Sequence, residues 1–259
     1  MTLRKPVVEY HLRGYLKAML WFIAIYMGIY LLAIGSLGVV SFGSTGNDAG
    51  GFSTSGIEFA FGLFFLVACM ASYKEENDFL LQHGVSRKAA FIGFVVSTVI
   101  GISIGALLVV ISDAVFRGII SVSGVDLGII GVFSQFFAPW SESVGRIPAF
   151  FVTFLWMWTY FFAAGSLGYS VASIFHRLSK MGKILICAGA GVTVIIILPF
   201  INTLTGGRLG ATMLSWLTWM LLGGGDMATP IPSMTVFFFF TLVSLAICWL
   251  FMRRFQVQK

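Results

Sequence analysis

Acidic residues near the ends of apolar segments are the side chains in this sequence best suited to chemistry within a membrane. Glu58 opens one apolar segment and Asp113 closes another. A charged side chain at membrane depth is costly, so such residues are candidates for a transport path. Two interpretations remain open: headgroup water solvates each carboxylate, or the two carboxylates line a substrate path. Arg117 follows Asp113 by four residues, a spacing that would pair their side chains on a helix end.

Signatures of catalysis and of nucleotide binding are weak in this chain. His11, His83 and His176 are far apart and have no metal-ligand spacing. The sequence has neither an HExxH zinc motif nor a GxxxxGK[ST] phosphate loop. Ser166 and Ser170 lie in an apolar segment and leave an intramembrane hydrolase as the least favoured function. We expect no catalytic residue, no metal and no cofactor in this chain.

The elements that must position these residues are membrane helices. Hydrophobic residues make up 58% of the sequence and charged residues only 10%, whereas soluble domains carry roughly a quarter charged residues. The cysteines lie in apolar segments without a disulfide or CxxC pattern. The net charge of +6 comes from basic residues at segment ends and not from a contiguous patch, so we expect no nucleic-acid partner.

Six apolar segments are long enough to cross a bilayer, whose hydrocarbon core needs about 20 helical residues. Lipid forces the backbone polar groups to pair within each segment, which favours helix. We therefore predict an all-α membrane protein with a single domain over residues 1–259. The predicted spans are Leu16–Phe42, Ile57–Tyr73, Ala89–Phe116, Ile147–Phe175, Ile184–Leu204 and Ile231–Met252.

The basic residues predict the orientation of these spans. Of the 16 Lys and Arg residues, all but Arg117, Arg146 and Arg208 lie in the two terminal segments and the even-numbered loops. Cytoplasmic loops carry the excess of Lys and Arg in membrane proteins. The sequence therefore predicts a multi-pass protein of the cell membrane with both termini in the cytoplasm.

Two outer loops are too apolar to be simple connections. Residues 119–140 are apolar but are interrupted by glycine, aspartate and proline, and we interpret them as an interfacial helix. Residues 209–222 contain two tryptophans and end at three glycines, so they are too short and too broken to span. We predict a re-entrant or surface-lying helix there.

The N-terminal residues 1–15 predict an amphipathic elbow helix that leads into the first span. Arg13 and Lys17 share one face, while the other face is apolar. That apolar face consists of Val8, Leu12, Tyr15, Leu16 and Met19. Either the helix only anchors the chain on anionic headgroups, with membrane lipid as its partner, or it also meets a cytoplasmic protein.

The loop 74–88 after the second predicted span is the most informative cytoplasmic segment. It begins with acidic residues and continues with three large apolar side chains at positions 79–81. Gly84 suits the end of a helix and Ser86 suits the N-cap of the next one. We predict one short helix in this loop. Its apolar residues either rest on the bilayer, cover the end of the helix bundle, or dock in a groove of a partner protein.

The sequence Glu75-Glu76-Asn77-Asp78-Phe79-Leu80-Leu81-Gln82-His83-Gly84-Val85-Ser86-Arg87-Lys88 resembles that of a type-2 ATP-binding-cassette (ABC) transporter permease. The resemblance extends over the whole chain in architecture, through the amphipathic helix and the six spans. In that family this segment forms a coupling helix that docks on the ATPase subunit. Gly84 stands where many members have proline. The positions that the resemblance assigns to ATPase docking are Glu75, Glu76, Phe79, Leu80, Leu81, Val85, Ser86 and Arg87.

The resemblance implies a permease that works with other subunits. A second permease chain, identical or paralogous, and two cytoplasmic ATPase subunits that bind ATP and Mg²⁺ would complete the transporter. We expect export of an apolar or amphipathic substrate, such as a peptide, an antibiotic or a lipid-like molecule. The alternative function is a non-transporting immunity or sensor subunit that binds a peptide or lipid.

Small residues in the fourth predicted span allow close helix packing. Gly165, Gly168 and Ala172 follow one another at spacings of three and four residues. They would lie either at a seam between two permease chains or between helices of one chain.

Overall fold

The structure, a computed structural model, describes residues 4–41, 55–123, 132–193, 197–222 and 229–253. Every regular element within these ranges is a helix, which confirms the prediction of an all-α protein for this part of the chain. The helices are α1 (Arg4–Ser41), α2 (Ser55–Gln82), α3 (Arg87–Ser123), α4 (Val132–Val144), α5 (Arg146–Arg177), α6 (Lys180–Val192), α7 (Leu198–Leu204), α8 (Arg208–Leu222) and α9 (Pro230–Met252).

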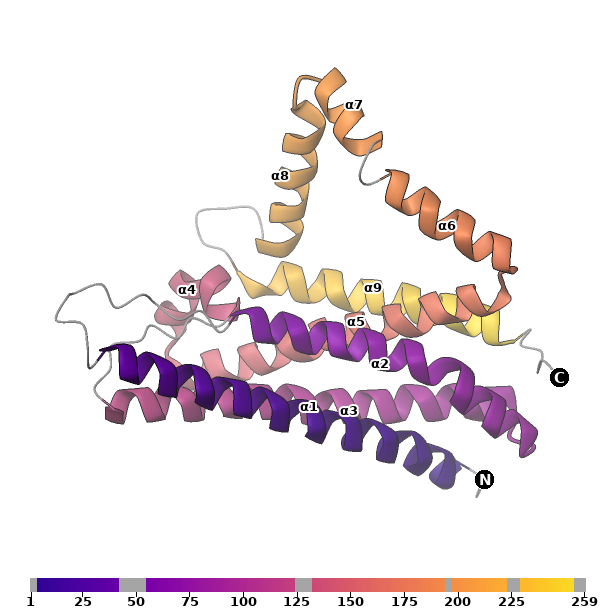
Figure 1. Cartoon of the computed structure of the whole chain (residues 1–259), viewed down its shortest axis with the longest axis horizontal. Helices are drawn as coiled ribbons and strands as arrows, with labels where there is room; N and C mark the ends of the chain where they lie inside the picture. The colour runs from indigo at the N-terminus through magenta and orange to yellow at the C-terminus, as the bar shows by residue number, and fades with distance from the viewer. Residues whose placement is uncertain (1–3, 42–54, 124–131, 194–196, 223–228, 254–259) are drawn as a thin grey trace.

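The long helices α1, α2, α3, α5 and α9 form a bundle (Figure 1). The start of α1, the turn between α2 and α3, and the last residues of α5 and α9 lie at the same end of this bundle. We call this end the Gly84 end. The opposite end, which carries α4 and the start of α2, is the Glu58 end.

Three helical segments in the described residues are long and apolar enough to cross a membrane. They are Arg87–Val115 in α3, Ile147–Arg177 in α5, and Pro230–Met252, the whole of α9. They coincide with the third, fourth and sixth predicted spans and indicate a membrane-embedded protein. The other three spans remain predictions.

The predicted elbow helix is continuous with the first predicted span, because α1 runs unbroken from Arg4 to Ser41. Its buried side chains recur every fourth residue at Val7, His11, Tyr15 and Met19. This spacing aligns them on one face of the helix. The same face packs against α3, so the N-terminal segment belongs to the bundle.

Glycines set the closest helix contacts of the bundle. A Cβ on Gly168 of α5 would overlap the backbone carbonyl of Leu66 in α2, and one on Gly165 would press against the Cys69 sulfur. On α3, a Cβ on Gly93 would collide with Val7 of α1. Gly165 and Gly168 therefore pack within one chain, which decides between the two locations that the sequence left open for them.

Helix α4 overlaps the segment for which we predicted an interfacial helix after the third span. Its side chains Val132, Phe133 and Phe137 are buried in the main apolar cluster of the bundle. The helix is kinked at Phe137, two residues before Pro139. Helix α4 packs against α2 and α5 at the Glu58 end, while its side chains Phe136 and Val144 are 38% and 39% exposed. The interfacial location therefore remains a prediction. The preceding residues 124–131 lie outside the described ranges.

Helices α6, α7 and α8 form an arm that projects away from the bundle (Figure 1). The predicted fifth span, Ile184–Leu204, contains most of α6 and the whole of α7. Residues 194–196, between these two helices, lie outside the described ranges, so this span remains a prediction. The predicted short outer helix is α8, and none of the described side chains in α6, α7 or α8 is buried.

Candidate functional site

The turn at the Gly84 end joins α2 to α3. Helix α2 continues through the predicted loop to Gln82, so the prediction of a separate short helix is wrong. No proline or glycine interrupts residues 74–82, and nothing in this stretch stops the helix. Gly84 then takes a φ of 77°. The Val85 amide donates to the Leu80 carbonyl at 3.0 Å and the Gly84 amide to Leu81 at 3.1 Å, the pattern of a Schellman helix end.

The next helix begins at once. The Ala89 amide donates to the Ser86 side-chain oxygen at 3.2 Å, which is the bond of an N-cap. The predicted helix end at Gly84 and the predicted N-cap at Ser86 are both confirmed. The ATPase-docking role of Ser86 remains a prediction. The two helices therefore meet through a short turn fixed by its own backbone bonds.

The predicted docking residues divide between the inside and the outside of this turn. Leu80 is 4% exposed and packs with Val7, Ala90 and Met252, while Val85 lies against the same cluster. Leu81 is half-buried against the neighbouring cluster around Tyr73. Leu80 therefore anchors the turn to the bundle and does not face outward.

Phe79 has the opposite orientation. It is 42% exposed and stacks on Tyr10 of α1, itself 43% exposed, with ring centroids 5.0 Å apart. The ring centroid of His83 lies 4.2 Å from that of Phe79. We call Tyr10, Phe79 and His83 the aromatic patch. The predicted docking residues Glu75, Ser86 and Arg87 are also exposed at this end.

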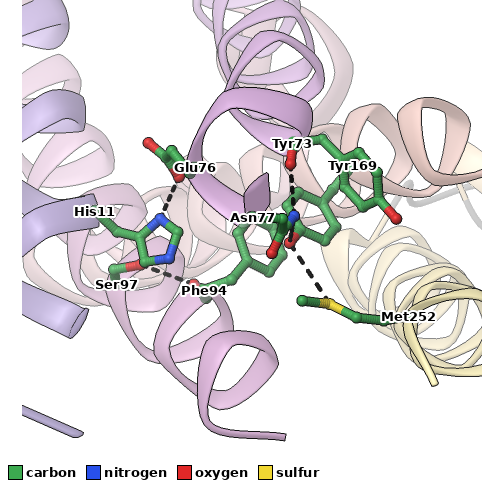
Figure 2. Close-up of polar contacts among 8 residues, drawn as sticks. All are labelled: His11, Tyr73, Glu76, Asn77, Phe94, Ser97, Tyr169 and Met252. Atoms are coloured by element: carbon green, nitrogen blue, oxygen red, sulfur yellow. Dashed lines mark hydrogen bonds and ion pairs between the residues drawn. The ribbon is translucent and has the colours of Figure 1, made fainter. Parts of the chain in front are cut away.

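Glu76 faces α1 and pairs with His11, whose side chain is fully buried. Figure 2 shows this pair beside a second polar group centred on Asn77. The Asn77 amide nitrogen donates to the Tyr73 carbonyl at 2.6 Å and to the Tyr169 hydroxyl at 2.8 Å. These bonds join α1, α2 and α5 directly behind the aromatic patch. Buried polar groups held in this way fix the relative position of helices.

Two arginine side chains donate hydrogen bonds to backbone carbonyls at the C-terminal end of α9. Arg87 donates to the carbonyl of Arg253, and Arg177 donates to the carbonyl of Phe251, each at 2.8 Å. The last carbonyls of a helix lack partners within it, and cations at that end also complement its dipole. The predicted docking residue Arg87 therefore has a structural role as well.

Glu58 lies at the other end of the bundle, far from the aromatic patch. Its side chain is buried, and a carboxylate oxygen accepts the Val132 amide at 2.6 Å. The carboxylate therefore holds the first turn of α4. The interpretation that headgroup water solvates this carboxylate is wrong. Asp113 is half-buried on α3. The side chain of Arg117 lies outside the described side chains, so the predicted pair remains a prediction.

An apolar groove of about 750 Å³ runs along α2, α5 and α9. It begins at Phe59, the neighbour of Glu58, and continues past Tyr160 to Leu167 on α5 and Phe240 on α9. A groove of this size and lining suits an apolar or amphipathic ligand. Glu58 is thus next to the groove but turned toward α4.

Other chemistry is weakly supported. Gly101-Ile102-Ser103-Ile104-Gly105 matches the letters GxSxG, but these residues lie within helix α3, whereas a nucleophile elbow needs a strand-to-helix turn. Ser103 instead accepts a bond from Trp158. The described residues hold no group of three or more metal-binding side chains. Sequence reasoning did not single out Tyr10 or Asn77. Comparisons of the chain with protein-family models, curated proteins and solved structures find no match.

Proposed function

We propose that this chain is the permease subunit of an ATP-driven ABC exporter. It crosses the cell membrane six times, with both termini and the Gly84 end in the cytoplasm. A separate ATPase subunit binds ATP and Mg²⁺ and docks at the Gly84 end. A second permease chain completes the translocation path.

The observation that carries this proposal is the exposed aromatic patch on the segment that resembles a coupling helix. Aromatic side chains are enriched where proteins bind one another. The Schellman turn, the buried Leu80 and the His11–Glu76 pair fasten the segment that carries the patch to the bundle. A movement of a partner bound to the patch would therefore reach α1, α2 and α3.

The side-chain contacts at the Gly84 end give a different set of proposed ATPase-docking residues from the set that the resemblance assigned. Phe79, Tyr10 and His83 form the centre of the proposed surface, with Glu75 and Ser86 at its rim. Leu80 supports this surface from inside, so a Leu80→Asp variant would disturb the fold and could not test docking alone.

The apolar groove along α2, α5 and α9 supports an apolar or amphipathic substrate. Its lining includes the Tyr160 hydroxyl among apolar side chains. A peptide, an antibiotic or a lipid-like molecule could contact such a surface through its apolar part. Glu58 and Asp113 remain candidates for the substrate path.

Docking can be tested by co-expressing the chain with an ABC ATPase encoded beside it and measuring how much ATPase co-purifies. Phe79→Ser should reduce recovery about tenfold, as expected for an interface hot spot. The matched control is Phe151→Ser, an exposed phenylalanine near the other end of the bundle, on α5, that is 61% exposed. Equal recovery with both variants, at unchanged yield of the chain, contradicts the proposed docking surface.

Transport and orientation need separate measurements. ATP-dependent efflux from vesicles that contain both proteins distinguishes an exporter from a non-transporting immunity or sensor subunit. A Gln82→Cys variant should react with a membrane-impermeant thiol reagent only after the cytoplasmic side is opened, and the unsubstituted chain controls for its native cysteines. Labelling of the introduced thiol from outside intact cells contradicts the proposed orientation.

A further inference from the structure

A second feature of the Gly84 end is a cavity of about 540 Å³ between the last turns of α5 and α9. It is lined by Arg177, Leu250, Phe251 and Arg253. Two guanidinium groups and two apolar side chains thus share one cavity. The aromatic patch and the groove along α2, α5 and α9 do not include these residues.

We propose that this cavity binds one anionic phospholipid, with its phosphate between Arg177 and Arg253 and an acyl chain along Leu250 and Phe251. The membrane-crossing segments end at Arg177 and Met252, which places the guanidinium groups at headgroup depth. Leu250 lies about one turn closer to the bilayer centre than Arg253 and is 61% exposed. The guanidinium groups therefore lie at the level of a lipid phosphate, and Leu250 lies at the level of its acyl chain.

The arginines suit a phosphate because a guanidinium presents several donors in one plane. Arg177 uses one nitrogen on the Phe251 carbonyl. Its guanidinium carbon lies 5.2 Å from the centre of the Phe251 ring. This contact and this bond orient the group and leave other N–H donors for a phosphate oxygen. The Arg253 side chain is exposed at the same rim.

The surroundings favour an anion over a zwitterion. Arg177 and Arg253 both line the cavity, and the described lining residues include no acidic side chain. Anionic lipids concentrate at such basic sites on the cytoplasmic leaflet. The inference needs the membrane placement of α5 and α9, and it holds whether or not the chain transports.

The test is a lipid titration of the purified full chain in detergent, followed by native mass spectrometry. The probes are phosphatidylglycerol, phosphatidylcholine and inorganic phosphate. Both lipids carry the phosphate, but the cationic choline of phosphatidylcholine is repelled by the two guanidinium groups. We therefore expect phosphatidylglycerol to bind about tenfold more tightly than phosphatidylcholine. Arg253→Gln should remove most of this difference, and Leu250→Gln should weaken phosphatidylglycerol binding without changing the response to inorganic phosphate.

Lys180→Gln is the matched control, because it removes the same charge three residues after Arg177 without lining the cavity. It should leave the preference for phosphatidylglycerol unchanged. An equal loss in Lys180→Gln and Arg253→Gln would overturn the site in favour of general surface charge. Equal binding of the two lipids would also overturn it, as would displacement of phosphatidylglycerol by inorganic phosphate at similar concentrations. Unchanged recovery of a co-expressed ATPase with Arg253→Gln separates this result from the docking proposal.

Discussion

The bundle and the arm are both rich in apolar side chains, but only the bundle packs them against one another. Gly168 in α5 touches the backbone of α2, whereas Gly189 in α6 has nothing within 4 Å of the position that a Cβ would take. A glycine therefore permits close packing of helices but does not cause it. A facing helix with a complementary surface is also needed.

Polar side chains distinguish the two regions further. In the bundle, Asn77 bonds to Tyr169 and Trp156 bonds to Ser233, each across a pair of helices. In the described arm, the Gly210 amide of α8 donates to the Asn202 side chain of α7, a bond that does not reach the bundle. The arm is held to the bundle mainly through the contact of α8 with α9.

The largest loss of stability in the bundle is expected from removing His11, whose fully buried side chain pairs with Glu76. His11→Ala leaves a cavity and takes away a partner of the Glu76 carboxylate, which together should cost about 3–5 kcal/mol. Thermal unfolding in detergent should show this loss as a lower melting temperature. Asn202→Ala in the arm removes one neutral bond and should cost about 1 kcal/mol. Similar melting temperatures for the two variants would contradict the difference between the regions.

Cavity formation should separate the regions next. Leu80→Ala removes a buried side chain that is 4% exposed, and such truncations cost about 2–5 kcal/mol of unfolding free energy. Leu204→Ala on α7 removes a side chain that is 72% exposed and should change stability by less than about 0.5 kcal/mol. Chemical unfolding of the two variants in the same detergent measures both values. A large effect at Leu204 would mean that the arm is packed in solution.

The glycine comparison can be tested directly. Gly168→Ala forces a methyl group onto the Leu66 carbonyl, and overpacking of this kind costs about 1–3 kcal/mol. Gly189→Ala meets open space and should stabilise α6 by up to about 1 kcal/mol, because alanine favours helix. Hydrogen exchange on α5 and α6 reads out each change locally. Destabilisation of both helices to the same extent would contradict the assignment of Gly168 to a close helix contact and of Gly189 to open space.

The smallest expected effect comes from a single polar bond. Trp156→Phe removes the 2.9 Å bond from the indole to the Ser233 hydroxyl, which keeps its own bond to Pro230. The expected loss is about 1 kcal/mol. Trp219→Phe on α8 changes a side chain that is 61% exposed and should be neutral. The melting temperatures of the two variants show whether the bond between Trp156 and Ser233 stabilises the bundle. Equal melting temperatures would contradict that role.

Local features of the structure were predictable from the sequence. Gly84 and Ser86 sit at the helix end and the N-cap as expected, because a positive φ and a side-chain cap depend on residues within a few positions. The apolar face of α1 was predicted only in part. Of its predicted residues, Tyr15 and Met19 are buried, while the other buried positions are Val7 and His11. The prediction of a separate short helix was wrong because residues 74–82 contain no helix-breaking residue, so α2 continues to Gln82.

The amino-acid sequence by itself determined that the chain is helical and apolar enough for a membrane, since composition and run length decide both. Tertiary structure alone decided that Phe79 faces outward while Leu80 faces the core. It also decided that Glu58 holds α4 and that Gly168 meets α2. Each of these outcomes depends on a surface supplied by a distant part of the chain, which the local sequence does not encode.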